Sequence, residues 1–200
     1  MPDSSLHFAL VGHSFVSRAD QHLQATNFNN FGLPTFSHNI ELHGQSGAHI
    51  LDILPLFQQC STTPDVVIID VGTNDLTNFR APPHTLALQV FNIARRLITH
   101  HNVSHVVILQ VLPRTTWGRH GQPPSFSSRV ARFNEMIESL VYRYKSTISI
   151  SCWVHHGMRS QIDNFVSDGV HLNQAGMVKY VKSVRRSILA VSRLLRSRSA

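Results

Sequence analysis

Cysteine is scarce in this sequence, and long hydrophobic runs are lacking. The two cysteines, Cys60 and Cys152, show no spacing typical of a disulfide framework, so we interpret them as free thiols without a role. The apolar runs at 66–71 and 106–111 are far too short to cross a bilayer. The first residues also lack the basic start and the long apolar stretch of a signal peptide. We therefore expect an intracellular, cytoplasmic protein.

Repeats, low-complexity tracts and interdomain linkers are lacking as well. A chain of 200 residues with 42% apolar side chains suits one domain with a sizeable core. The sequence thus predicts a single domain over residues 1–200.

Charge is distributed unevenly along the chain. Residues 1–113 carry four basic and seven acidic side chains, whereas residues 114–200 carry fourteen basic and four acidic ones. Fifteen of the 18 cations are arginine, which pairs with phosphate in a forked geometry. The basic part is interpreted either as a merely solvated surface or as a surface for an anionic partner.

Apolar runs alternate with longer segments of helical periodicity. The predicted strands are Leu6–Val11, Ile40–Leu42, Val66–Val71, Val106–Leu112 and Ile148–Trp153. The predicted helices span residues 16–26, 48–59, 84–101, 128–145 and 174–195. Runs that are apolar throughout suit strands covered on both faces, as in a parallel sheet between helix layers. The sequence therefore predicts a three-layer α/β/α sandwich with a five-stranded parallel sheet.

Polar motifs follow the first three predicted strands. Ser14 stands at a helix start, where it is either a nucleophile or only a helix cap. Gly47 can offer its backbone N–H to a ligand, or it can belong to an ordinary turn. Asn74 can donate its side-chain amide, or it can serve as a turn or cap residue. Because the carboxyl ends of parallel strands meet at one edge, these groups are expected side by side. The irregular stretch 113–127 follows the fourth strand and is expected to form a wall of the same pocket.

An acid and a base follow near the end of the chain. Asp168 and His171 are three residues apart in a turn-rich segment, so both can reach one site. A serine hydroxyl needs an imidazole to take its proton, and the imidazole needs an acceptor on its other nitrogen. The alternative is that Asp168 caps the helix that begins near Asn173. With Ser14 as nucleophile, the set predicts hydrolysis of carboxylic esters without a metal or cofactor.

These motifs resemble the SGNH, or GDSL-type, hydrolase family over nearly the whole chain. The four sequence blocks of that family match Ser14, Gly47, Asn74 and His171, and Asp168 precedes the histidine by three residues. The resemblance implies a flavodoxin-like fold, a Ser14–His171–Asp168 triad and an oxyanion hole of Ser14, Gly47 and Asn74. It also implies acyl esters as substrates, including lipids and acetylated small molecules.

Three segments resemble a narrower group, the esterase-like domains of animal LINE-type retrotransposons. They are Gly12–Val16, Asp70–Leu76 and Gln110–Arg114. This resemblance implies a domain of a first open reading frame product that acts beside RNA-binding segments.

One position departs from the family. His13 stands where the family has aspartate, so a group that is neutral or cationic near neutral pH replaces a carboxylate. His13 is expected to modulate activity, and His13→Asp to keep or raise it. The alternative function is a catalytically weak module that binds RNA, anionic lipid or protein. The other histidines, including those at 100–101 and 155–156, show no metal-ligand spacing, so no metal site is expected.

The last predicted helix has an apolar face and a basic face. Its apolar residues recur at steps of three and four and are expected to pack on the sheet. They are Val181, Val184, Ile188, Val191 and Leu195. The basic face is expected either to be solvated or to bind RNA or anionic headgroups weakly. It consists of Lys179, Lys182, Arg186 and Arg193.

Overall fold

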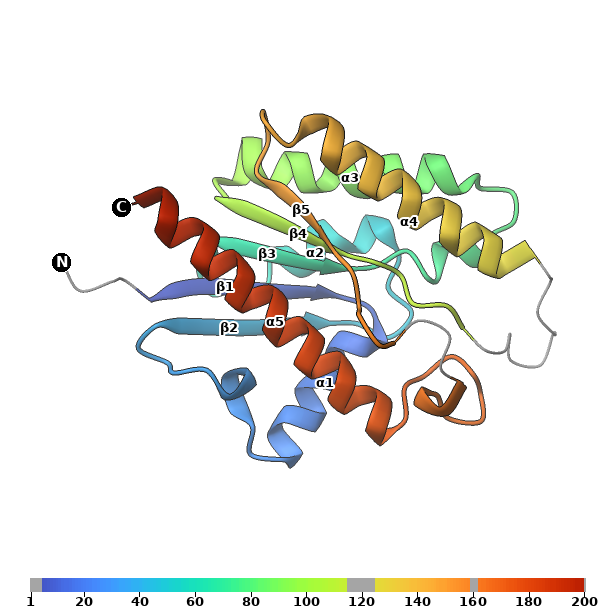
Figure 1. Ribbon diagram of the computed structural model, residues 1–200, viewed down its shortest axis with the longest axis horizontal. Coiled ribbons are helices and arrows are strands. Elements are labelled where there is room, and N and C mark those ends of the chain that lie inside the picture. Colours follow the sequence, from blue (N-terminus) through green and yellow to red (C-terminus); the bar gives the residue numbers. More distant parts are fainter. Residues whose placement is uncertain (1–4, 115–124, 159–161, 200) are drawn as a thin grey trace.

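A parallel sheet of five strands forms the centre of the computed structural model, which describes residues 5–114, 125–158 and 162–199 (Figure 1). The strand order is β2-β1-β3-β4-β5, and every neighbouring pair is parallel. The strands are β1 (Leu6–Gly12), β2 (His38–Gly44), β3 (Val66–Asp70), β4 (His105–Leu109) and β5 (Ile150–Trp153). The order is that of the flavodoxin-like fold.

Helices cover both faces of this sheet (Figure 1). The α-helices of the described residues are α1 (Ser14–Ala25), α2 (Ile53–Phe57), α3 (Pro83–His101), α4 (Ser125–Tyr144) and α5 (Gln174–Ser199). Side chains of α1 and α5 form one core with one face of the sheet, and side chains of α2, α3 and α4 form a second core with the other. Every residue of β3 and β4 is buried, as expected for central strands between two helix layers. The predicted α/β/α sandwich is confirmed.

Most element boundaries differ from the sequence prediction by a few residues, and two of the differences have a local reason. The helix expected over 48–59 is a 3₁₀ turn at Ile50–Asp52 followed by the five-residue α2. Pro55 lies in the first turn of α2, where its missing N–H removes no helical hydrogen bond. The fourth strand ends at Leu109 instead of residue 112, because the Asn134 side chain satisfies both backbone groups of Val111 at 3.0 Å.

The packing of α5 matches its predicted apolar face. Val181, Val184, Ile188 and Val191 are buried, and Leu195 packs against the same core. The four cations of the predicted basic face are exposed. No described helix is long and apolar enough to span a membrane.

The topology creates a crevice between the carboxyl ends of β1 and β3. The chain leaves β1 into α1 on one face of the sheet and leaves β3 toward α3 on the other. Gly12 at the end of β1 lies so close to β3 that an added Cβ would be 2.1 Å from the Asp70 carbonyl oxygen. Glycine therefore lets the strand that precedes Ser14 approach its neighbour.

Candidate active site

A pocket of about 220 Å³ opens at this carboxyl edge. It brings together five residues that the sequence analysis singled out: His13, Ser14, Gly47, Asn74 and His171. The remaining lining residues are Phe15, Ser46, Thr73, Arg114 and Val170. Residues 115–124 of the expected pocket wall lie outside the described residues.

Ser14 is the first residue of α1, and its side chain is half-buried. The helix is capped by His13, whose Nδ1 accepts a hydrogen bond of 3.3 Å from the Phe15 N–H. The interpretation of Ser14 as only a helix cap is therefore wrong. The Ser14 N–H belongs to the first turn, where helical N–H groups have no intrahelical partner and the helix dipole favours negative charge.

Asp168 holds His171 in a fixed orientation. Its Oδ2 lies 2.7 Å from His171 Nδ1, while its Oδ1 accepts the backbone N–H groups of Val170 and His171 at 2.8 and 2.9 Å. Burial acts to raise the pKa of Asp168, but these hydrogen bonds lower it to about 2. A carboxylate on Nδ1 selects the tautomer whose Nε2 is free to accept a proton.

The alternative role of Asp168 as a helix cap is also wrong. Asn173 immediately precedes α5, and its Oδ1 accepts the Gly176 N–H at 2.9 Å. Within the described residues, no hydrogen bond joins the Ser14 hydroxyl to His171, although both line the same pocket. Catalytic hydrogen bonds are often absent or long before substrate binds.

The loop after β2 and the loop after β3 are tied together beside Ser14. Asn74 Nδ2 donates to the Ala48 carbonyl at 2.9 Å, so one of its two amide hydrogens remains available. Gly47 precedes Ala48 and has φ of +78°, which favours glycine even though an added Cβ would touch nothing. This tie places the Gly47 backbone and the Asn74 amide on one side of the pocket.

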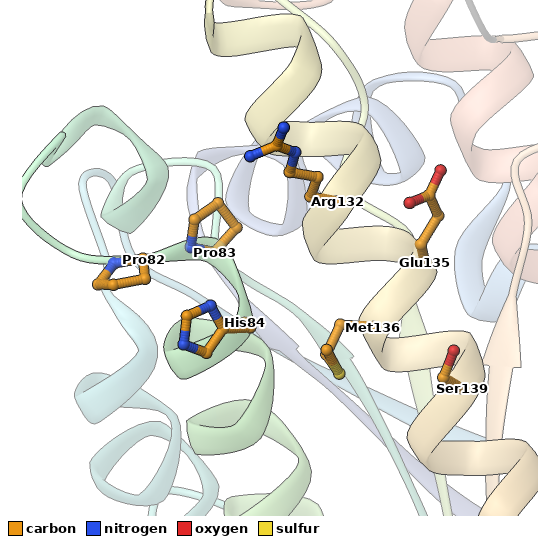
Figure 2. Close-up of a pocket in the computed structure, with 7 residues that line it drawn as sticks. All are labelled: Pro82, Pro83, His84, Arg132, Glu135, Met136 and Ser139. Atoms are coloured by element: carbon orange, nitrogen blue, oxygen red, sulfur yellow. The ribbon is translucent and has the colours of Figure 1, made fainter.

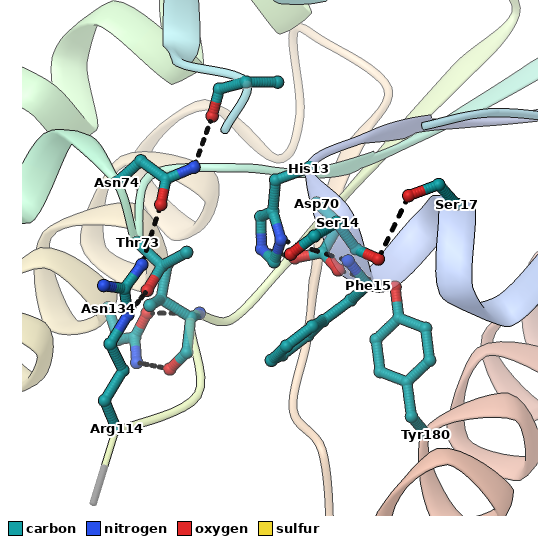
Figure 3. Close-up of polar contacts among 12 residues, drawn as sticks. His13, Ser14, Phe15, Ser17, Asp70, Thr73, Asn74, Arg114, Asn134 and Tyr180 are labelled. Carbon is teal, nitrogen blue, oxygen red and sulfur yellow. Dashed lines mark hydrogen bonds and ion pairs between the residues drawn. The ribbon is translucent and has the colours of Figure 1, made fainter. Parts of the chain in front are cut away.

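Arg114 is a site residue that the sequence reasoning missed as such. Its Nη2 donates to Asn74 Oδ1 at 2.7 Å and its Nε donates to Thr73 Oγ1 at 3.0 Å (Figure 3). Burial lowers the pKa of Arg114, and the charge of Asp168 acts in the opposite direction. The bond to Oδ1 fixes the Asn74 amide so that its nitrogen faces away from the guanidinium. The position of Arg114 just after a predicted buried strand was the sequence signal that could have identified it as a site residue.

A second network lies beneath Ser14. His13 Nε2 is 3.3 Å from Asp70 Oδ1, and the Tyr180 hydroxyl donates to Asp70 Oδ2 at 2.5 Å (Figure 3). All three side chains are buried. Burial acts to raise the pKa of Asp70, but His13 and Tyr180 lower it overall. The network links the residue before Ser14 to β3 and α5.

The sequence matches the model of the GDSL-like lipase/acylhydrolase family over residues 10–179. The chain belongs to this family. No curated protein matches the sequence at a significant level.

Several solved structures share the fold of this chain at low sequence identity. A GDSL-like lipase from Bacteroides thetaiotaomicron superposes with a TM-score of 0.72 and 16% identity, covering 92% of this chain and 88% of that one. An acetyl esterase mutant with bound acetate has a TM-score of 0.67 and 15% identity, covering 95% and 99%. An acetylxylan esterase mutant from Geobacillus stearothermophilus has a TM-score of 0.65 and 13% identity, covering 94% and 96%.

The His13–Asp70 pair changes the expectation that His13→Asp keeps or raises activity. His13→Asp would place two carboxylates together in a buried position, where like charges cannot both ionise. The substitution is therefore expected to be harmful in this chain unless Asp70 is changed with it.

A larger pocket of about 500 Å³ lies between the start of α3 and α4 and shares no lining residue with the pocket that contains Ser14 (Figure 2). It is lined by Pro82, Pro83, His84, Arg132, Glu135, Met136 and Ser139. His84, Glu135 and Ser139 are exposed, and no hydrogen bond joins them in the described part of the chain. Its polar groups therefore lack the mutual orientation that a nucleophile and base require.

Proposed function

We propose that this chain hydrolyses carboxylic esters with Ser14 as nucleophile, His171 as base and Asp168 as the group that orients His171. The observation that supports the proposal is the shared pocket, which both Ser14 and His171 line, while Asp168 holds Nδ1 of the imidazole. Membership of a lipase and acylhydrolase family supports the same reaction class. Loss of the proton from Ser14 to an imidazole is the step that makes a serine hydroxyl a competent nucleophile.

The reaction follows in two halves. Ser14 Oγ attacks the ester carbonyl while His171 Nε2 takes its proton, and the carbonyl oxygen becomes an oxyanion. The N–H groups of Ser14 and Gly47 and the free amide hydrogen of Asn74 stabilise that oxyanion. The C–O bond to the alcohol then breaks, and His171 returns the proton to the alcohol. Water, activated by His171, hydrolyses the acyl-serine and regenerates Ser14.

The pocket favours a short acyl group. Its volume of about 220 Å³ is below the range of about 300–1,000 Å³ in which drug-sized ligands bind. Two of the similar structures are described as acetyl esterases, which agrees with an acetyl-sized substituent. We therefore place acetyl and other short acyl esters ahead of long-chain lipids.

Hydrolysis of nitrophenyl esters of rising acyl length tests this proposal. The acetate ester is expected to be hydrolysed, and turnover is expected to decline with acyl length. In Ser14→Ala, turnover is expected to fall by several orders of magnitude. Ser17→Ala is the matched control, because Ser17 lies one turn along α1. Among the described residues its hydroxyl bonds only to the Ser14 carbonyl, at 3.2 Å. Equal activity in Ser14→Ala and Ser17→Ala contradicts the assignment.

The exposed cations of α5 favour a second, separate candidate function. Lys182, Arg186 and Arg193 face away from the core, and a basic surface of this kind attracts RNA or anionic lipid. We also infer from the resemblance of the segments around Ser14, Asn74 and Arg114 that the chain derives from a retrotransposon protein. In this second candidate function, the exposed α5 cations are the groups that would contact RNA.

A further inference from the structure

A carboxylate, an imidazole and a thiol, all groups that can bind metal ions, lie together at the sheet away from the proposed active site. Glu41 and His43 stand two residues apart on β2, so their side chains share one face of the strand. Cys60 follows α2, which packs over that face. One ligand atom from each of these three residues lies within 4.8 Å of the others. All three side chains are partly buried.

A second histidine points at the same carboxylate. His7 of β1 has its Nε2 2.9 Å from Glu41 Oε1, while Glu41 Oε2 lies 3.0 Å from His43 Nε2. His7 Nε2 is buried, yet within the described residues it makes no hydrogen bond of acceptable geometry. The other ring nitrogen of His7 is held by Thr62 Oγ1 at 3.1 Å. A buried nitrogen without a hydrogen bond is costly, and a metal ion would satisfy it.

We propose that Glu41, His43 and Cys60, with His7 as a fourth ligand, bind a zinc-type divalent cation. Imidazole nitrogen, thiolate sulfur and a carboxylate oxygen are the ligands that Zn²⁺ takes in proteins, commonly four at a time. Calcium and magnesium prefer oxygen ligands alone, so the sulfur and nitrogen atoms select against them. The hydrogen bonds from the Ser61 N–H and hydroxyl to Glu41 would orient the carboxylate.

From the sequence we expected no metal site and no role for Cys60, so this proposal departs from that expectation. Residues 7, 41, 43 and 60 show no regular ligand spacing, because the pairing of β1 with β2 and the short α2 bring them together. Burial, followed by the charge of Glu41, raises the pKa of the Cys60 thiol to about 11. The metal-free thiol is therefore a poor nucleophile, and this argues against a reactive cysteine at this position.

The bound ion would stabilise the fold without taking part in catalysis. None of the four residues lines the pocket that contains Ser14. In the sheet register His43 pairs with Val11, whose side chain belongs to the core beneath α2 and α3. An ion bound there would join β1, the edge strand β2 and the segment after α2.

Metal content and cobalt spectroscopy test the site directly. The purified protein is loaded with Zn²⁺, dialysed against metal-free buffer and analysed by elemental mass spectrometry, with the expectation of about one zinc per chain. Replacement by Co²⁺ is expected to give the visible bands of a four-coordinate ion and a thiolate charge-transfer band. Zinc at a hundredfold excess over its Kd is expected to raise Tm by about 5 °C or more.

Two cysteine variants separate the outcomes. Cys60→Ser is expected to lose the charge-transfer band and to bind zinc at least tenfold more weakly, and His43→Gln to weaken binding similarly. Cys152→Ser is the matched control, because Cys152 lies on β5 at the opposite edge of the sheet. Wild-type protein that retains no zinc, or Cys60→Ser that retains zinc as well as Cys152→Ser does, overturns the proposal. Ester hydrolysis by Cys60→Ser is expected to match that of the wild type.

Discussion

His13 and Asp70 form a buried pair, with 3.3 Å between His13 Nε2 and Asp70 Oδ1. They come from the ends of adjacent strands, so the pair fixes the backbone that presents Ser14. The Tyr180 hydroxyl supports the same carboxylate from α5. In this chain a histidine and a carboxylate from the neighbouring strand thus support the backbone beside the proposed nucleophile.

The first prediction concerns this pair. His13→Asp is expected to lower the free energy of unfolding by about 3–5 kcal/mol and to reduce turnover, because one of two adjacent buried carboxylates must take a proton. Urea unfolding and ester hydrolysis measure the two effects. The double variant His13→Asp with Asp70→Asn is expected to recover part of both. A single variant that is as stable and active as the wild type would show that the pair has no positioning role.

A second prediction concerns the Asn74 amide. Asn74→Ala is expected to lower kcat by about 10²–10³-fold with little change in KM, because its hydrogen bond strengthens as the oxyanion forms. Arg114→Ala is expected to lower kcat by about 10–100-fold, since the guanidinium acts on the reaction through the orientation of the Asn74 amide.

A double-mutant cycle distinguishes the two roles. In the Asn74→Ala background, Arg114→Ala is expected to cost much less than it does alone, because the two side chains act as one unit. Strict additivity of the two losses contradicts a positioning role for Arg114.

The third prediction concerns stability in acid. Burial lowers the pKa of His105 to about 4 and that of His155 to about 4, from the ordinary histidine value of 6.5. Between pH 6.5 and pH 4 these two histidines therefore bind protons in the unfolded chain but not in the folded chain. Their contribution to the free energy of unfolding is fully present above pH 6.5 and is lost as the pH falls toward 4. Each group contributes a loss of about 3 kcal/mol across that window.

Urea unfolding between pH 7 and pH 4 measures this loss. His105 is held by Ser149 and Ser151, so His105→Asn keeps a polar partner for them while it removes the titrating group. The variant is expected to show a shallower dependence of unfolding free energy on pH. The same slope as in the wild type excludes His105 as a source of acid sensitivity.

The fourth prediction concerns the basic face of α5. Replacement of Lys182, Arg186 and Arg193 by glutamine is expected to reduce retention on RNA or anionic vesicles at low salt and to leave ester hydrolysis unchanged. Lys179 is kept in this variant because its Nζ bonds Asn164 Oδ1 at 2.9 Å. The matched control replaces the exposed residues Arg18, Arg95 and Arg96, which removes the same charge elsewhere. Equal retention of both variants indicates a merely solvated face.

Features that depend on local sequence were predictable from the sequence. Apolar runs such as that at 66–69 indicated buried strands, and the parallel arrangement then brought Ser14 and Asn74 to one edge. Features that depend on strand register or on long side chains were not predictable. The pairing of His13 with Asp70 requires the register between β1 and β3, and the contact of Arg114 with Asn74 spans 40 positions of sequence.

Covalent labelling of Ser14 tests the central claim most directly. An organophosphorus ester reacts with an activated serine hydroxyl, which displaces the leaving group and forms a stable phosphoryl-serine. Intact-protein mass spectrometry is expected to show one adduct in the wild type, located at Ser14, and the same adduct in Ser17→Ala. Labelling is expected to vanish in Ser14→Ala and to slow by orders of magnitude in well-folded His171→Ala. An adduct at another residue, or equal labelling rates in wild type and His171→Ala, would contradict the account.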